Sequence, residues 1–129
     1  MENSSPELAW IRAWAHRNNL ETGSIRRQYF EFEQCPNCNV TVIPIGFFIP
    51  PRRAVGQVLF CETRLKSLFI GIKDGSPIPP IPFTINADDR GVVRNGFHRF
   101  YLSAFFGFGS IPSCKITFLD PEVGSIEVL

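Results

Sequence analysis

The chain has 129 residues and a net charge of +1, and 44% of its residues are hydrophobic whereas only 19% are charged. This balance predicts one folded domain and excludes extensive disorder. The near-neutral charge argues against a strongly basic nucleic-acid surface but leaves a local basic patch open. No apolar run approaches the roughly 20 residues that span a bilayer, and the start MENSSPELAW lacks the features of a signal peptide. We therefore expect a cytoplasmic protein with no membrane segment.

The first part of the chain predicts a helix and then a strand. Ser5 suits the N-cap of a helix, Pro6 suits its first turn, and Asn18-Asn19 suits its end. The apolar stripe of this helix consists of Leu8, Ile11 and Ala15, widened by Trp10 and Trp14. In the following stretch IRRQYFEFE, phenylalanine alternates with glutamate, which is typical of a strand.

Four cysteines, Cys35, Cys38, Cys61 and Cys114, raise the question of disulfides or zinc. Disulfides are rare inside cells, and a structural zinc site needs more ligands than the one CPNC pair. Cys61 and Cys114 each fall on an apolar face of a predicted element. We therefore interpret CPNC as a turn with two free thiols and expect no metal, with zinc as the alternative. The strand-like NVTVIPI after it argues against a thioredoxin-type motif.

The middle of the chain predicts a strand, a helix and a hairpin. NVTVIPIGFFI reads as a mostly buried strand, and Pro44 places it at an edge or a bulge. Apolar residues then recur every three or four positions, which predicts a helix over about 54–73 that buries Cys61 and ends at Asp74-Gly75. The charges of this helix, such as Arg64, are expected to face solvent. Residues 83–85 and 92–93 form the predicted hairpin around the turn NADDRG.

The stretch NGFHRFYLSAFFGFGSIP predicts a third helix over about 97–107, with Asn95 as its N-cap and aromatic residues on one face. SCKITF then predicts a strand with Cys114 facing inward, and the residues from 120 to 129 predict a turn and a short strand.

The start of this third helix has the properties of an anion site. Its first backbone N–H groups lack partners within the helix, and the helix dipole adds positive charge there. Gly96 allows close approach, His98 adds a tunable donor, and Arg99 adds a permanent cation. We predict a phosphate site at this position. The alternative is a structural role in which Arg99 pairs with Asp88 or Asp89 across the hairpin turn.

Two segments, VVRNGFHRFYLSAFFGFGSIP and IPPRRAVG followed by LKSLFIGIKDGSPIPPIPF, resemble the ParB/sulfiredoxin-like superfamily over about residues 40–118. The resemblance implies a single α+β domain with a mixed, curved β-sheet flanked by helices. Residues 40–129 would form the ParB/sulfiredoxin-like domain. Residues 1–39 would be an N-terminal helix and strand extension that packs on it.

The resemblance also implies a ligand, a nucleotide (ATP, ADP or CTP) with or without Mg²⁺. Its phosphates would be bound by Asn95, Gly96, Phe97, His98 and Arg99, with Arg52 from a "PR" box and Arg94 adding positive charge. Phe97 stands where sulfiredoxins carry their catalytic cysteine and ParB proteins a glutamate, so sulfiredoxin-type reduction is excluded. If the domain is an enzyme, nucleotide hydrolysis, phosphoryl transfer or nuclease activity is expected.

Several secondary roles stay open. Glu31 or Glu33 could supply an acidic base, although strand glutamates usually face solvent. Asp88 and Asp89 could hold Mg²⁺, although a hairpin tip explains them as well. The alternative function is a non-catalytic protein-interaction module, which the 13 phenylalanines and the proline-rich SPIPPIP would serve as a partner surface. A ParB-like nuclease or DNA-binding protein is the third hypothesis, and the neutral charge does not favour it.

Overall fold

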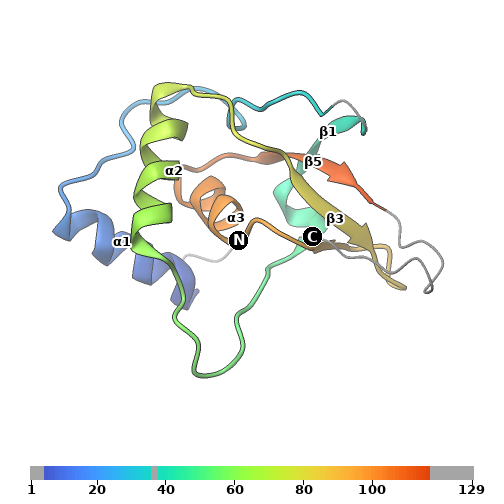
Figure 1. Cartoon of the computed structure of the whole chain (residues 1–129), viewed down its shortest axis with the longest axis horizontal. Coiled ribbons are helices and arrows are strands. Elements are labelled where there is room, and N and C mark those ends of the chain that lie inside the picture. The colour runs from blue at the N-terminus through green and yellow to red at the C-terminus, as the bar shows by residue number, and fades with distance from the viewer. Residues whose placement is uncertain (1–4, 36–37, 117–129) are drawn as a thin grey trace.

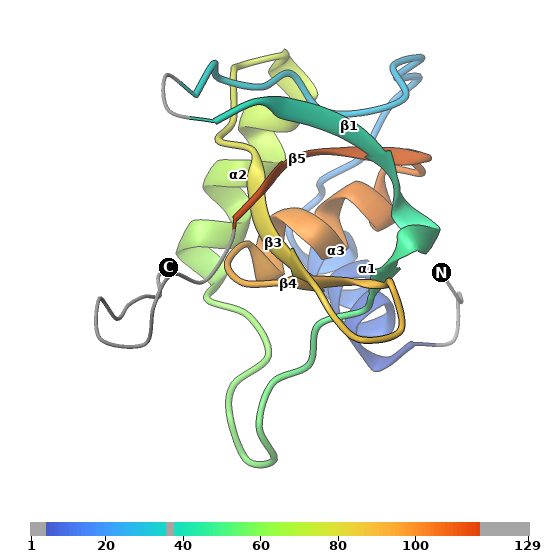
Figure 2. The ribbon, with the colours of Figure 1, turned by 90° about the vertical axis from the view of Figure 1, so that its right-hand side faces the viewer.

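The computed structural model describes residues 5–35 and 38–116. In this part of the chain the fold is α+β, with three α-helices and a mixed five-stranded sheet that curls into a half-barrel (Figures 1 and 2). The expected α+β class and curved mixed sheet are thereby confirmed. None of the helices described is long and apolar enough to cross a membrane. The turn and short strand expected over 120–129 lie outside the described residues.

The sheet has the strand order β1-β5-β3-β4-β2. The β5–β3 and β4–β2 pairs are parallel, whereas β1–β5 and β3–β4 are antiparallel. The strands are β1 Val40–Pro44, β2 Phe48–Ile49, β3 Ile81–Ile85, β4 Gly91–Val93 and β5 Ser110–Lys115.

The strand expected over NVTVIPIGFFI is divided between the two edges of the sheet. A 3-10 turn, η1 Ile45–Phe47, follows Pro44 and carries the chain from β1 across to β2 (Figure 2). The edge position expected from Pro44 is confirmed, since β1 pairs only with β5. β2 packs closely on β4 because Gly91 has no Cβ, which would lie 2.6 Å from the Phe48 ring.

The first helix, α1 Pro6–Arg17, begins and ends as its sequence predicts. Ser5 Oγ accepts a hydrogen bond from the Leu8 N–H at 3.1 Å, and Asn18 closes the helix by donating to carbonyls of its last turn. The stripe Leu8, Ile11 and Ala15 is buried, as predicted, and it belongs to the same hydrophobic core as the rest of the described chain.

The second helix, α2 Glu62–Asp74, begins eight residues later than expected. Ala54 and Val58 lie instead in an exposed segment that extends away from the body of the protein (Figure 2). Gly56 turns this segment at a φ of +90°, which a helix does not contain. The prediction that Cys61 lies in the core is therefore wrong, because Cys61 precedes the helix and is exposed. Gly75 ends the helix in the left-handed conformation, as predicted.

The predicted strand over IRRQYFEFE reduces to one bridge, in which Phe32 pairs with Ile78. Phe30 is fully buried, whereas Glu31 and Glu33 are exposed, as expected for the glutamates. The segment thus anchors the chain beside β3 without adding a strand to the sheet.

Aromatic side chains form most of the core. The third helix, α3 Phe97–Phe105, packs against both α1 and α2 and lies against the concave side of the sheet (Figure 2). Its residues Phe100, Tyr101 and Leu102 are almost fully buried. Every phenylalanine in the described residues is buried or partly buried. Burial of these rings stabilises the core, while the expectation that phenylalanines also form a partner surface stays a prediction.

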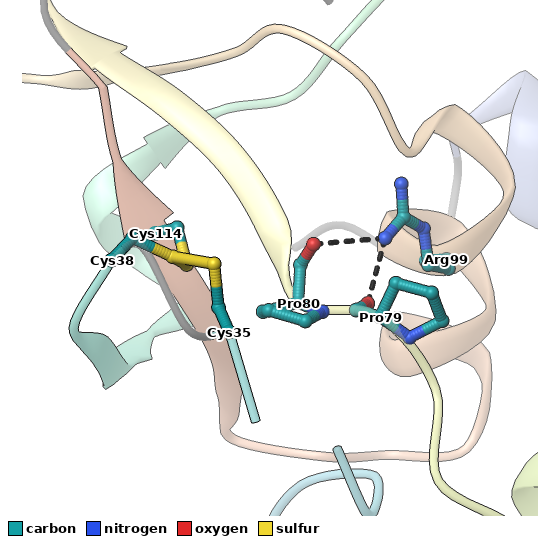
Figure 3. The surroundings of a disulfide bond; sticks show 6 residues. All are labelled: Cys35, Cys38, Pro79, Pro80, Arg99 and Cys114. Atoms are coloured by element: carbon teal, nitrogen blue, oxygen red, sulfur yellow. Dashed lines mark hydrogen bonds between the residues drawn. A yellow bond between two sulfur atoms is a disulfide. The ribbon is translucent and has the colours of Figure 1, made fainter. Parts of the chain in front are cut away.

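The pairing of β1 with β5 brings three cysteines together. Cys114 lies opposite Val40, two residues beyond Cys38, and its side chain is 5% exposed, as the inward-facing prediction requires. Cys38 Sγ is in disulfide contact with the Sγ atoms of both Cys35 and Cys114 (Figure 3). The interpretation of CPNC as a turn with two free thiols is therefore wrong, because the register of β1 and β5 places Cys114 against Cys38.

Candidate functional site: an arginine-lined cavity

An open cavity of about 730 Å³ lies between the N-terminal halves of α2 and α3. This size is in the range of small-molecule sites. Its floor is the turn from β4 into α3, and its walls come from α2 and from the segments before α2 and β3. The lining residues are Pro51, Arg53, Cys61, Thr63, Arg64, Ser67, Leu68, Pro79, Val93, Arg94 and all of Asn95–Arg99.

The predicted site residues Asn95 to Arg99 therefore meet in one cavity, but the helix begins differently from the prediction. Gly96, and not Asn95, is the N-cap of α3, and no side chain caps the helix there. Gly96 has a φ of +113°, and a Cβ on it would lie 3.0 Å from the Arg99 guanidinium and 3.1 Å from Ile81. Only glycine fits this position, because the space of its missing side chain is filled by Arg99.

Arg99 is fixed by backbone carbonyls and not by the hairpin turn. Its Nη1 donates to the carbonyl oxygens of Pro79 at 2.6 Å and Pro80 at 2.9 Å (Figure 3). The alternative pairing with Asp88 or Asp89 is thus wrong. Burial lowers the pKa of Arg99, as does the nearby charge of Arg64, whereas Glu33 raises it. Arginine remains charged in proteins, so Arg99 is a cation held in place beside the cavity.

His98 connects the starts of α2 and α3. The backbone N–H of Cys61 donates to His98 Nε2 at 2.9 Å, and the imidazole is 5% exposed. Burial first, and then the charges of Arg53, Arg64 and Arg99, lower the pKa of His98 from 6.5 to about 4. His98 is therefore neutral at physiological pH, and its Nε2 accepts a hydrogen bond. The donor expected of His98 is therefore not its Nε2, and this contact makes His98 a positioning residue between the starts of α2 and α3.

Three further arginines line the cavity. Arg53 lies over the Phe97 ring, 4.2 Å from its centroid, and donates from Nε to the Leu59 carbonyl. Arg94 donates from Nε to Thr84 Oγ1 at 2.8 Å, and the exposed Arg64 enters from the first turn of α2.

Sequence reasoning favoured Arg52 over its neighbour Arg53, yet Arg53 is the one in the cavity lining. The charge of Arg52 instead lies near Tyr101, whose pKa is raised by burial first and by Glu7 second and lowered by Arg52. Arg64 was expected to face solvent, and only the packing of α2 beside α3 shows that it borders the site. The pair of adjacent arginines in the sequence predicts which segment contributes to the cavity. It does not predict which of the two arginines lines the cavity.

No carboxylate belongs to the lining residues that the structure describes. Asp88 and Asp89 sit at the tip of the β3–β4 hairpin, where Asn86 Oδ1 accepts hydrogen bonds from the N–H groups of Asp88 and Arg90. This hairpin turn explains the acidic pair without a metal. The lining residues therefore offer Mg²⁺ no acidic ligand, and Mg²⁺ fits this cavity only as an ion carried on phosphates.

Comparison with models of known protein families finds no match to this chain, and a search of curated proteins finds no matching sequence. The resemblance to the ParB/sulfiredoxin-like superfamily accordingly stays a prediction.

Proposed function

We propose that the cavity binds the phosphate groups of a nucleotide. The observation that carries the proposal is that four arginines, Arg53, Arg64, Arg94 and Arg99, line one cavity whose described lining contains no carboxylate. Like charges gathered in this way repel one another, and after burial, which is the larger cause, this repulsion also lowers the pKa values of His98 and Arg99. A bound polyanion relieves that repulsion, so the cavity favours phosphates strongly.

The backbone adds to the attraction. The first turn of α3 presents amide groups without intrahelical acceptors at the cavity floor, and the helix dipole places partial positive charge there. The motif Asn95–Arg99, which the superfamily resemblance associates with phosphates, forms this floor. Apolar lining from Phe97, Leu68 and Val93 offers a surface for a base or ribose beside the charged end.

The proposed function is binding, without an assigned reaction. The described lining holds no acidic base, His98 Nε2 already accepts a hydrogen bond, and Phe97 occupies the position of the superfamily's reactive residues. Glu31 and Glu33 are exposed and do not line the cavity. The size of the Tm shift with ATP, ADP and CTP identifies which of these nucleotides binds.

Thermal unfolding of the full chain tests this proposal. We would measure the Tm with ATP, ADP, CTP and GTP, with and without Mg²⁺, and with inorganic phosphate. A ligand at about 100 times its dissociation constant adds about 2.7 kcal/mol, which is a shift of several degrees in a domain of this size. Arg64→Ala should abolish most of the shift without unfolding the protein, because this side chain is exposed.

Arg17→Ala is the matched control, since Arg17 is an exposed helical arginine outside the cavity lining. It should keep the full shift. Absence of a shift with every nucleotide, in a protein that unfolds cooperatively, contradicts the proposal. A shift with single-stranded DNA that falls steeply with salt would instead favour the nucleic-acid hypothesis.

The second candidate function, a protein-interaction module, is favoured by one observation. Val55 is 105% exposed and Val58 is 78% exposed, in the segment that extends from the body of the protein (Figure 2). Apolar side chains on such a projection suit insertion into a partner. A paired Val55→Ser and Val58→Ser variant would abolish capture of a partner if this function holds, while leaving the Tm and any nucleotide shift unchanged.

A further inference from the structure

Cys35, Cys38 and Cys114 form a group of three sulfur atoms. Disulfide bonds join sulfurs in pairs, so they cannot use all three. All three Sγ atoms lie within 4.8 Å of one another, and Cys38 Sγ contacts both others (Figure 3). A sulfur atom forms only one disulfide, so a Cys35–Cys38 bond and a Cys38–Cys114 bond exclude each other in any single molecule. Whichever bond forms leaves a third thiol beside it. A metal ion, by contrast, uses all three sulfurs at once.

The dimensions of the group suit zinc. Zn²⁺ bound by thiolates has Zn–S distances of about 2.3 Å, so sulfurs of a tetrahedral site lie about 3.8 Å apart. The two Sγ pairs now in disulfide contact would open to this spacing, and the remaining Cys35–Cys114 pair already lies within 4.8 Å, so side-chain rotations suffice to reach it. Thiolates are soft ligands that select zinc over magnesium or calcium.

The backbone holds the three ligands in place. Antiparallel pairing sets Cys114 of β5 opposite Val40 of β1, which places it beside the CPNC turn just before β1. The Cys38 N–H donates to the Cys35 carbonyl at 3.4 Å, which holds these two cysteines close together. Cys114 is buried, whereas Cys35 and Cys38 are half-buried, so the group has a shielded side and a side open to an entering ion.

We propose that Cys35, Cys38 and Cys114 bind one Zn²⁺ ion as thiolates, each thiol releasing its proton to solvent. Among the described residues no further His, Cys, Asp or Glu joins the group, so a water or a ligand from outside these residues takes the fourth position. The ion would link residues 35–38 to β5 across a separation of 76 residues and thereby stabilise the β1–β5 edge. This proposal is independent of the nucleotide site.

The test is metal binding by the full chain, purified under reducing conditions without chelators. We expect elemental analysis to find one zinc per chain. We also expect Co²⁺ added to the metal-free reduced protein to give a thiolate charge-transfer band. Cys35→Ser and Cys114→Ser should each weaken zinc binding by more than the roughly 10–100-fold that loss of a supporting partner causes. Cys61→Ser is the control, since Cys61 is a free, exposed cysteine outside the group.

Several outcomes would overturn the proposal. Reduced wild-type protein that takes up neither Zn²⁺ nor Co²⁺ would do so, as would a Cys61→Ser variant as deficient as Cys35→Ser. Isolation of the chain with a disulfide at Cys38 that persists under Zn²⁺ and reductant would also contradict it. If Cys114→Ser fails to fold, the half-buried Cys35→Ser and the number of thiolates in the cobalt spectrum still decide the matter.

Discussion

The arginine-lined cavity and the three-cysteine group both border the start of β3, yet they are built in different ways. Arg99 is fixed by the Pro79 and Pro80 carbonyls that lead into β3, whereas Cys114 lies opposite Pro82 within it. The cavity gathers like charges that repel one another, and two of them, Arg53 and Arg99, donate to backbone carbonyls. The cysteine group gathers three sulfur atoms, two from the CPNC stretch and one that the register of β1 and β5 brings beside them. The first region therefore carries an unfavourable positive field, and the second does not.

The largest expected effect comes from removing the support of Arg99. Gly96→Ala forces a residue with a side chain to a φ of +113° and into the Arg99 guanidinium. Left-handed strain of about 1–2 kcal/mol and loss of charge-assisted hydrogen bonds of about 1.5–3 kcal/mol should together cost about 2.5–5 kcal/mol of unfolding free energy. Denaturant unfolding measures this directly.

Gly107→Ala is the matched control, since Gly107 also has a positive φ, +81°, but nothing lies within 4 Å of its added Cβ. It should cost only the strain, about 1–2 kcal/mol. Equal losses in the two variants would show that Arg99 does not depend on Gly96.

The next effect is the pH dependence that burial, together with the nearby arginine charges, imposes through His98. Its pKa is lowered from 6.5 to about 4, so the unfolded chain binds a proton that the folded chain does not between these values. This contribution to stability is complete above pH 6.5 and is lost as the pH falls toward 4, with a size of about 2 kcal/mol after allowance for solvent. Unfolding measured from pH 7.5 to 4 tests the direction and the size.

His98→Gln should flatten this pH dependence, because glutamine keeps an acceptor for the Cys61 N–H without titrating. His16→Gln should leave it unchanged, since His16 is exposed on α1. If the unfolding free energy of His98→Gln still falls with pH as in the wild type, the pH dependence comes from another group.

The smallest effect distinguishes two adjacent arginines. Arg53 lines the cavity and covers Phe97, whereas Arg52 is outside the lining. Arg53→Ala should therefore lose an exposed cation–π contact of about 0.5–1 kcal/mol and weaken nucleotide binding, and Arg52→Ala should do neither. Binding constants and Tm values of the pair provide the comparison, and reversed roles would restore the assignment made from the sequence.

The two regions also show what the sequence reveals. The contiguous stretch Asn95–Arg99 identified the cavity floor because a helix start after a glycine has the same backbone chemistry in any fold. The partners of Arg99 and His98, the carbonyl of Pro80 and the amide of Cys61, are backbone groups that no side-chain pattern indicates.

Periodicity was reliable for α1 and failed before α2. The apolar spacing at Ala54 and Val58 matched a helix, but Gly56 and the preceding prolines favour an extended segment. The cysteine group was missed for a related reason, since Cys114 meets CPNC only through the register of β1 and β5. Local pattern thus predicted most elements and the floor of the cavity, while every contact between distant segments required the structure.

Calorimetric titration of the chain with the nucleotide that gives the largest Tm shift tests the central claim most directly. We predict a single site whose dissociation constant rises at least about tenfold in Arg64→Ala, stays unchanged in Arg17→Ala, and rises with salt because screening weakens charge attraction. Equal affinity of wild type and Arg64→Ala, or no heat of binding with any nucleotide, would contradict the claim that the four arginines form a phosphate site.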